Sequence, residues 1–263
     1  DLSIDYGKQI SKDFTLQFKG TFTFARNKVL EYDEAPGLRP GMKTVGRRLN
    51  TFLGYVTNGL YENYTDVEES PTSTLGNIAI SPGDIKYVDQ PDANGNYDGR
   101  ITSDDRVEIG DPWIPEIVYG FGPSMRWKNW DFSFFFQGQT NVSLIMENFE
   151  PFGERSARGV LAWIADDYWS PDHPNVNAKH PRLTRLTNNH NMQVSTYWLR
   201  DASFLKLKNV ELGYSYKKAR FYISGSNLLT ISPFKHWDPE VGTGAGMQYP
   251  TQRIFNLGIQ MSF

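Results

Sequence analysis

An alternation of aromatic and polar side chains with a period of two constrains this sequence more than any other feature. Between residues 14 and 24, every second residue is Phe, Leu or Gly, and Thr, Gln and Lys fill the positions between them. Successive side chains of a β-strand point to opposite sides, so the pattern predicts a strand with one apolar and one polar face. Residues 254–263 repeat it with Phe255, Leu257 and Ile259. The sequence therefore predicts an all-β fold.

The same periodicity predicts seven strands. They lie at about 2–9, 14–26, 117–127, 130–138, 204–216, 220–231 and 254–263. In one of them the alternation changes phase near Asn209, which indicates a β-bulge. A strand of about 11 residues, rising about 3.3 Å per residue and tilted by about 40°, spans roughly 28 Å. That length fits the apolar layer of an outer membrane, whereas no apolar run approaches the roughly 20 residues of a transmembrane helix.

The connections between these strands are alternately short and long. Short ones fall at about 10–13, 128–129 and 217–219, and long ones at about 27–116, 139–203 and 232–253. Alternate connections of an antiparallel sheet lie at opposite ends, so all the long ones share one end. Outer-membrane barrels have short periplasmic turns and long extracellular loops. The sequence predicts an antiparallel transmembrane β-barrel with long extracellular loops and with Phe263 at the periplasmic rim.

Seven strands do not close a bacterial single-chain barrel, because these barrels have even strand numbers. The remaining strands and any plug domain are therefore expected N-terminal to Asp1, outside this chain. No positively flanked apolar segment follows Asp1, so an export signal is expected upstream as well.

Composition and motifs exclude several functional classes. The chain has no cysteine, which excludes thiolate metal sites and a Cys nucleophile. Its 27 basic and 30 acidic residues are interspersed without a basic block, so nucleic acid is not an expected partner. No GxSxG, HExxH, P-loop or dinucleotide motif occurs. We therefore predict that the protein is not an enzyme.

Several segments, taken together and in this order, resemble one family. They are PGDIKYVDQ (82–90), DGRITSDDRVEIGDPWIPEIVYGF (98–121), WDFSFFFQGQ (130–139), YWLRDASFLKLKNVELGYSY (197–216), FYISGSNLLTIS (221–232), HWDPEVG (236–242) and RIFNLGIQMSF (253–263). The chain resembles the SusC/RagA group of TonB-dependent transporters in the outer membrane of Bacteroidetes-type bacteria. The resemblance covers most of the chain from residue 82 onward, while residues 1–81 are compatible with it but less distinctive.

The resemblance implies a plugged barrel of about 22 strands, of which this chain supplies the C-terminal part. It further implies outer-membrane lipid around the barrel, a SusD-like surface lipoprotein as an extracellular cap, and TonB acting from the periplasm through the missing plug. Such transporters import nutrient oligomers, either oligosaccharides or peptides.

Oxygen-bearing side chains alternate along the segment 92–105, as in the calcium loop of an EF-hand. The expected ligands are Asp92, Asn94, Asn96, Asp98 and Asp105, together with the carbonyl of Arg100. The pattern departs from an EF-hand in having Asn at the first position and the shorter Asp at the last. We predict a structural Ca²⁺ in an extracellular loop, and the alternative is a polar turn whose residues only set the backbone geometry.

A second candidate site lies in the last long connection, at His236, Trp237 and Asp238. Aromatic rings stack on the apolar patches of sugar faces, and Asp or His binds hydroxyl groups, so these residues are candidates for substrate binding. The alternatives are an interfacial aromatic girdle or contact with a capping lipoprotein.

A third group contains Asp166, Asp167, Asp172, His173 and, further on, His180. Paired carboxylates near a histidine are typical of acid–base or metal sites. Nothing in the spacing fixes their geometry, and the surrounding segment is rich in Asn and Pro. We therefore interpret the group as part of a solvated loop.

Two other functional classes remain open on the sequence alone. One is a soluble β-sandwich that binds carbohydrate, in which the apolar stripes are buried against each other. The other is an outer-membrane enzyme or adhesin on a small barrel, which needs a positioned nucleophile and base if it is an enzyme. The sandwich is expected to be soluble without detergent.

Overall fold

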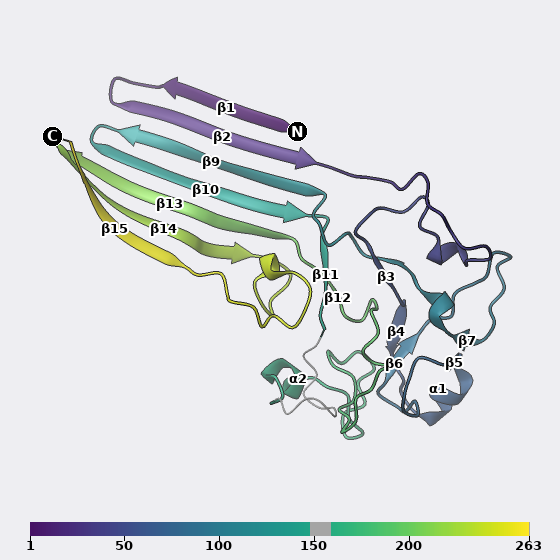
Figure 1. Ribbon diagram of the computed structural model, residues 1–263. Coiled ribbons are helices and arrows are strands. Elements are labelled where there is room, and N and C mark those ends of the chain that lie inside the picture. Colours follow the sequence, from purple (N-terminus) through teal and green to yellow (C-terminus); the bar gives the residue numbers. More distant parts are fainter. Residues whose placement is uncertain (148–158, 263) are drawn as a thin grey trace.

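The computed structural model describes residues 1–147 and 159–262, and its main element is one seven-stranded antiparallel sheet. In sheet order the strands are β1 (Leu2–Gln9), β2 (Phe14–Phe24), β9 (Ile117–Trp127), β10 (Trp130–Thr140), β13 (Phe204–Tyr216), β14 (Ala219–Ile231) and β15 (Ile254–Met261). Each pairs with the next of these strands along the chain (Figure 1). The predicted all-β, antiparallel fold class is confirmed. Phe263 and residues 148–158 of the predicted loop 139–203 lie outside the described residues.

The strand ends differ from the sequence prediction by a few residues. β2 ends at Phe24 instead of residue 26, where its pairing with Ile117 of β9 ends. Beyond it, the side chain of Arg26 forms an ion pair with Glu116. β10 continues to Thr140, where it still pairs with Ile117. The predicted phase change near Asn209 coincides with a shift in the strand register on either side of Lys208.

The short connections are tight hairpins at one end of the sheet. Lys128 and Lys217 have φ values of 53°, in the left-handed region, as the first central residues of two-residue hairpins require. All three hairpins and the C-terminal end of β15 lie at the same end of the sheet, and the long connections leave from the other end (Figure 1).

The long connections fold together into what we call the loop module, residues 25–116, 141–147, 159–203 and 232–253. Its paired strands are β3 (Phe52–Gly54) with β8 (Val107–Ile109), β4 (Thr57–Leu60) with β6 (Ile85–Tyr87), β5 (Thr72–Ser73) with β7 (Arg100–Ile101), and β11 (Ser143–Ile145) with β12 (Leu199–Asp201). Its helices are η1 (Pro40–Met42), α1 (Tyr64–Glu69), η2 (Ser103–Asp105), α2 (Ala162–Asp166) and η3 (Pro239–Val241). These elements fix long segments that would otherwise be free coil.

The hydrophobic core of the described chain lies in the loop module and not against the sheet. Tyr55, Ile85, Tyr87, Ile101 and Trp198 are each at most 3% exposed and belong to one buried cluster. Every buried member of this cluster comes from the loop module. Among the described residues, no helix combines the length and hydropathy needed to span a membrane.

Candidate functional site

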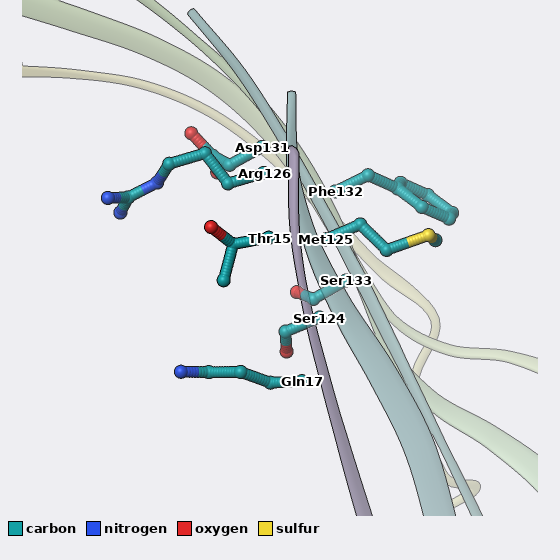
Figure 2. Close-up of a pocket in the computed structure, with 8 residues that line it drawn as sticks. All are labelled: Thr15, Gln17, Ser124, Met125, Arg126, Asp131, Phe132 and Ser133. Carbon is teal, nitrogen blue, oxygen red and sulfur yellow. The ribbon is translucent and has the colours of Figure 1, made fainter. Parts of the chain in front are cut away.

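The two faces of the seven-stranded sheet differ in their chemistry. Figure 2 shows Met125 and Phe132 projecting to one side of the strands, and Thr15, Gln17 and Arg126 projecting to the other. The register explains this, because it aligns like residues in rows across neighbouring strands. We call the side that carries Met125 and Phe132 the apolar face, and the opposite side the polar face.

The apolar face is a large exposed surface. Phe221 is 45% exposed, Ile223 54%, Phe255 76% and Leu257 83%. Within the described residues the other sheets have two strands each and belong to the loop module, so no second sheet covers this face. Soluble monomers rarely expose contiguous apolar patches of more than a few hundred Å². The geometry therefore requires an apolar environment, such as hydrocarbon, on this side.

Large aromatic rings gather on the apolar face near the hairpins. The rings of Trp130 and Tyr214 lie 4.7 Å apart, and Trp127 is 56% exposed beside them. The ammonium of Lys128 lies 5.6 Å from the centre of the Trp127 ring. Trp and Tyr are enriched where hydrocarbon meets water, because each has an apolar body and a polar tip. This arrangement is typical of an interfacial girdle.

The polar face carries an ion cluster that joins three strands. The guanidinium of Arg220 in β14 donates to Glu211 of β13 over 2.6 Å and to Asp131 of β10 over 3.0 Å. Gly213 lies between them, and a Cβ there would collide with both Arg220 and Asp131. Opposite charges on neighbouring strands stabilise the sheet and mark this face as hydrated or covered by polar groups. The cluster faces away from the apolar side.

The predicted calcium ligands do not converge on one point. Asp92 accepts hydrogen bonds from the backbone of Asn94 (2.7 Å) and Asn96 (2.9 Å), so it closes its own turn. These bonds hold the pKa of Asp92 below its ordinary value. Asp98 and the fully buried Asp105 instead face a guanidinium.

Arg39 supplies the positive charge that these carboxylates surround. Its Nη1 lies 2.7 Å from Asp105 and its Nη2 lies 2.6 Å from Asp98, while Asp89 is 3.8 Å away. Within the described ranges, no group of three or more His, Asp and Glu side chains is arranged to hold a metal ion. The Ca²⁺ site stays a prediction, and the structure offers Arg39 as the cation that stabilises this segment.

We expect Arg39→Gln to increase proteolytic cleavage within residues 84–105 about tenfold, because the buried Asp105 carboxylate loses its counter-charge. Limited proteolysis of the detergent-purified protein measures this rate, with excess chelator present so that metal loss cannot be the cause. The exposed Arg100 provides the control variant Arg100→Gln, for which no change is expected. Equal rates for the two variants would contradict the role of Arg39. Slower wild-type cleavage on adding Ca²⁺ would instead support the predicted ion.

The predicted substrate residues His236, Trp237 and Asp238 are adjacent but point to different partners. The His236 ring is exposed and lies 4.7 Å from the Trp163 ring. Trp237 donates from Nε1 to the carbonyl of Gly242 over 3.1 Å, and Asp238 binds Lys206. Trp237 and Asp238 therefore stabilise their own loop, and direct contact with a substrate stays a prediction.

A buried lysine attaches the last loop to the sheet. Lys206 of β13 is fully buried, and its Nζ donates to both carboxylate oxygens of Asp238 over 2.6 and 2.7 Å, and to Glu240. Burial is the largest single effect on both acids and raises the pKa of Asp238 and of Glu240. The hydrogen bonds from Lys206, together with the backbone N–H of Glu240 on Asp238 and with Lys208 on Glu240, outweigh it and lower both pKa values overall. Lys208 adds a second contact to Glu240 over 2.8 Å. The two carboxylates thus stay ionised and hold the loop in place.

In the third group of residues, Asp166 is exposed, as the interpretation as a solvated loop predicts, but His180 is buried and departs from it. His180 is 5% and Trp169 6% exposed, and the backbone N–H of Trp169 donates to the carbonyl of His180. Burial lowers the pKa of His180 to about 4, so this imidazole is neutral near pH 7. Asp172 and His173 are exposed, as expected for a loop. The loop therefore contributes to the core instead of lying over it.

Comparison with known proteins finds relatives that are similar over the whole of this chain. No family model matches the chain. TonB-dependent receptor P3 of Formosa agariphila is 28% identical over 300 residues, which cover 100% of this chain and 28% of that receptor. SusC of Bacteroides thetaiotaomicron, also a TonB-dependent receptor, is 25% identical over 283 residues, covering 100% of this chain and 26% of SusC. This chain is homologous to the C-terminal part of TonB-dependent receptors.

Solved structures agree with the assignment to TonB-dependent receptors at the level of the fold. A structure of the RagAB peptide transporter matches with a TM-score of 0.72 and 23% identity, covering 99% of this chain and 28% of that one. The RagAB peptide importer in its open-open state matches with a TM-score of 0.71 and 21% identity over the same shares. The resemblance to SusC/RagA-type receptors is thereby confirmed, and the chain spans about 28% of the length of these proteins.

Two interactions of this chain were not predicted by the sequence analysis. Arg182 forms a bidentate ion pair with the fully buried Asp84, in which Nε and Nη2 donate to the two carboxylate oxygens over 2.7 and 3.0 Å. About 100 residues separate the two in the sequence. The second interaction is that of Lys206 with Asp238 and Glu240. In the sequence, Lys206 cannot be told apart from the other polar residues of an alternating strand. The only available signal was that both acids lie in segments resembling the family, Asp84 in 82–90 and Asp238 in 236–242.

Proposed function

We propose that this chain forms C-terminal strands and extracellular loops of an outer-membrane importer that takes up nutrient oligomers with energy supplied through TonB. The observation that carries the proposal is the single-layered sheet with one exposed apolar face and one polar face. A barrel wall has these two faces, with lipid outside and a plug or water inside. The homology to TonB-dependent receptors supports the same function.

The orientation follows from the two ends of the sheet. Hairpins lie at one end and the loop module at the other, so the hairpin end is periplasmic and the loop module is extracellular (Figure 1). A SusD-like lipoprotein is proposed as the cap over the loop module. TonB is proposed to act through a plug that is not part of these residues. RagAB, described as a peptide transporter, and SusC support such an assembly.

The proposed cargo is an oligosaccharide or a peptide. Both carry oxygen atoms that accept hydrogen bonds and apolar surfaces that pack against aromatic side chains of the loop module. The soluble carbohydrate-binding sandwich finds less support. A sandwich buries its stripes against a second sheet, and the described residues leave Phe255 and Leu257 more than 70% exposed.

We expect the full-length protein to leave the membrane fraction only in detergent and to copurify with a surface lipoprotein. The physical reason is the apolar face, which has no cover of its own within the described chain. Membrane fractionation followed by size-exclusion chromatography measures both properties. A monodisperse monomer in detergent-free buffer would overturn the proposal. Loss of nutrient uptake on deleting TonB, with the protein still in the outer membrane, is the expected functional result.

A further inference from the structure

The guanidinium of Arg200, in β12 of the loop module, has no carboxylate partner among the described residues. Its Nη1 donates to the backbone carbonyls of Tyr197 and Leu199 over 2.7 and 2.8 Å. Its Nε and Nη2 form no hydrogen bond to any residue that the structure describes. Neither nitrogen belongs to the enclosed side-chain atoms that lack a partner, so both can be reached from solvent.

Other arginines of this chain show what the Nε–Nη2 edge of a guanidinium binds. Arg26 donates to Glu116 from Nε over 2.9 Å and from Nη2 over 2.6 Å. Arg182 contacts Asp84 through the same two nitrogens. The two N–H groups are parallel and match the spacing of two carboxylate oxygens, so these pairs are stronger than single hydrogen bonds. Arg200 presents the same edge to solvent.

A second cation and an imidazole lie near this guanidinium. Burial lowers the pKa of His236, and the positive charges of Arg200 and Lys179 lower it further, so both cations are within electrostatic range of the ring. The Nζ of Lys179 is 65% exposed and lies 3.7 Å from Asp167, which is too far for a hydrogen bond. The two cations thus exceed the one carboxylate that approaches them, and the excess favours an anion.

Burial makes the unpaired charge of Arg200 costly. It lowers the pKa of the guanidinium, and Tyr197 offsets that effect only in part. The group still stays charged near pH 7, because an arginine begins from a pKa of 12.5. A buried charge is stable when an opposite charge accompanies it and its hydrogen bonds are satisfied. An incoming carboxylate would supply both.

We propose that Arg200 binds a carboxylate of the transported oligomer through Nε and Nη2, with Lys179 and His236 beside it. The cargo is then an oligomer with carboxylate groups, carried either by uronic-acid sugars or by the acidic residues of a peptide. Both sources offer the same planar pair of oxygens to the guanidinium. The inference rests on the proposed function, because it names a chemical group of the cargo.

The test compares carboxylate-bearing hexamers with neutral ones on the detergent-purified full-length protein, by calorimetry. Hexagalacturonate is paired with maltohexaose, and hexaglutamate with hexaglutamine. We expect at least one charged hexamer to bind about tenfold more tightly than its neutral counterpart. The pair that shows the difference identifies the source of the carboxylate.

Arg200→Lys keeps the positive charge and a donor for the nearby carbonyls but lacks the two parallel N–H groups. It is expected to weaken binding of the charged hexamer about tenfold, whereas Arg185→Lys, at an exposed position of the loop module, is the control and changes nothing. Lys179→Gln alters an exposed side chain and is expected to weaken binding about threefold. It replaces Arg200→Lys in the test if that variant does not fold.

Equal binding of the charged and neutral hexamers would overturn the inference. Equal affinities of Arg200→Lys and Arg185→Lys, or of Lys179→Gln and the wild type in the replacement test, would do so as well. Detergent dependence and TonB-dependent uptake are measured separately. A TonB-dependent importer that binds charged and neutral hexamers equally would refute this site and leave the proposed function intact. Carboxylate binding without TonB-dependent uptake would refute the function and leave the site.

Discussion

Ile223→Arg combined with Leu257→Arg is expected to prevent the protein from reaching its folded barrel form. The two residues face each other across β14 and β15 on the apolar face, at 54% and 83% exposure. An Arg near the middle of the bilayer costs about 2–4 kcal/mol in a barrel, and like charges directly opposite repel each other in addition. The sum approaches the total stability of about 5–15 kcal/mol of an ordinary domain.

Ser224→Arg is the matched control for that double variant. Ser224 follows Ile223 along the strand but points to the polar face, where the register pairs it with Glu211 and Asn256. The added guanidinium therefore meets a carboxylate and water instead of hydrocarbon. Trypsin resistance of the outer-membrane fraction and the heat-dependent gel shift of folded barrels measure the outcome. Normal assembly of the double variant would show that the apolar face does not touch lipid.

The sheet was predictable because its determinants are local. Each strand shows its two faces through its own alternation, as in residues 14–24, and no distant residue is needed to decide which side is apolar. The alternating lengths of the connections placed the hairpins and long loops at opposite ends, as the structure has them. Even the bulge at Lys208 was visible as a change of phase near Asn209.

The loop module was not predictable in the same way, because partners far apart in sequence determine it. Nothing near residues 92–105 indicated that Arg39, about 60 residues upstream, would occupy the centre of the acidic group. Carboxylates bind a metal ion and a guanidinium equally well, so the spacing of the acidic residues could not distinguish the two. The resemblance of that spacing to a calcium loop favoured the metal ion. The same limit explains His180 and Trp169, whose burial depends on strands and loops from other parts of the chain.

Lys206→Met is expected to release the last loop, residues 232–253, from the sheet. The variant removes the fully buried ammonium group that contacts the carboxylates of both Asp238 and Glu240. Breaking such a partly buried pair costs about 3–5 kcal/mol. Lys208→Met is the control, because Lys208 is 22% exposed and contacts Glu240 alone, so its loss costs about 1 kcal/mol or less. Hydrogen exchange and limited proteolysis of this loop measure the difference.

The pH dependence of the stability of loop 232–253 distinguishes a contribution from the charge of Lys206 from one that comes only from packing of its side chain. Both acids have pKa values lowered from their ordinary 3.8 and 4.5, so the stabilisation is complete above those values and is lost as the pH falls through the lowered ones. The wild-type loop is therefore expected to become exchange-labile in acid, while the loop of Lys206→Met regains protection, because protonation removes its uncompensated charges. The two proteins should converge at low pH. A gap between them that stays constant with pH would mean that Lys206 acts through its methylene chain and not through its charge.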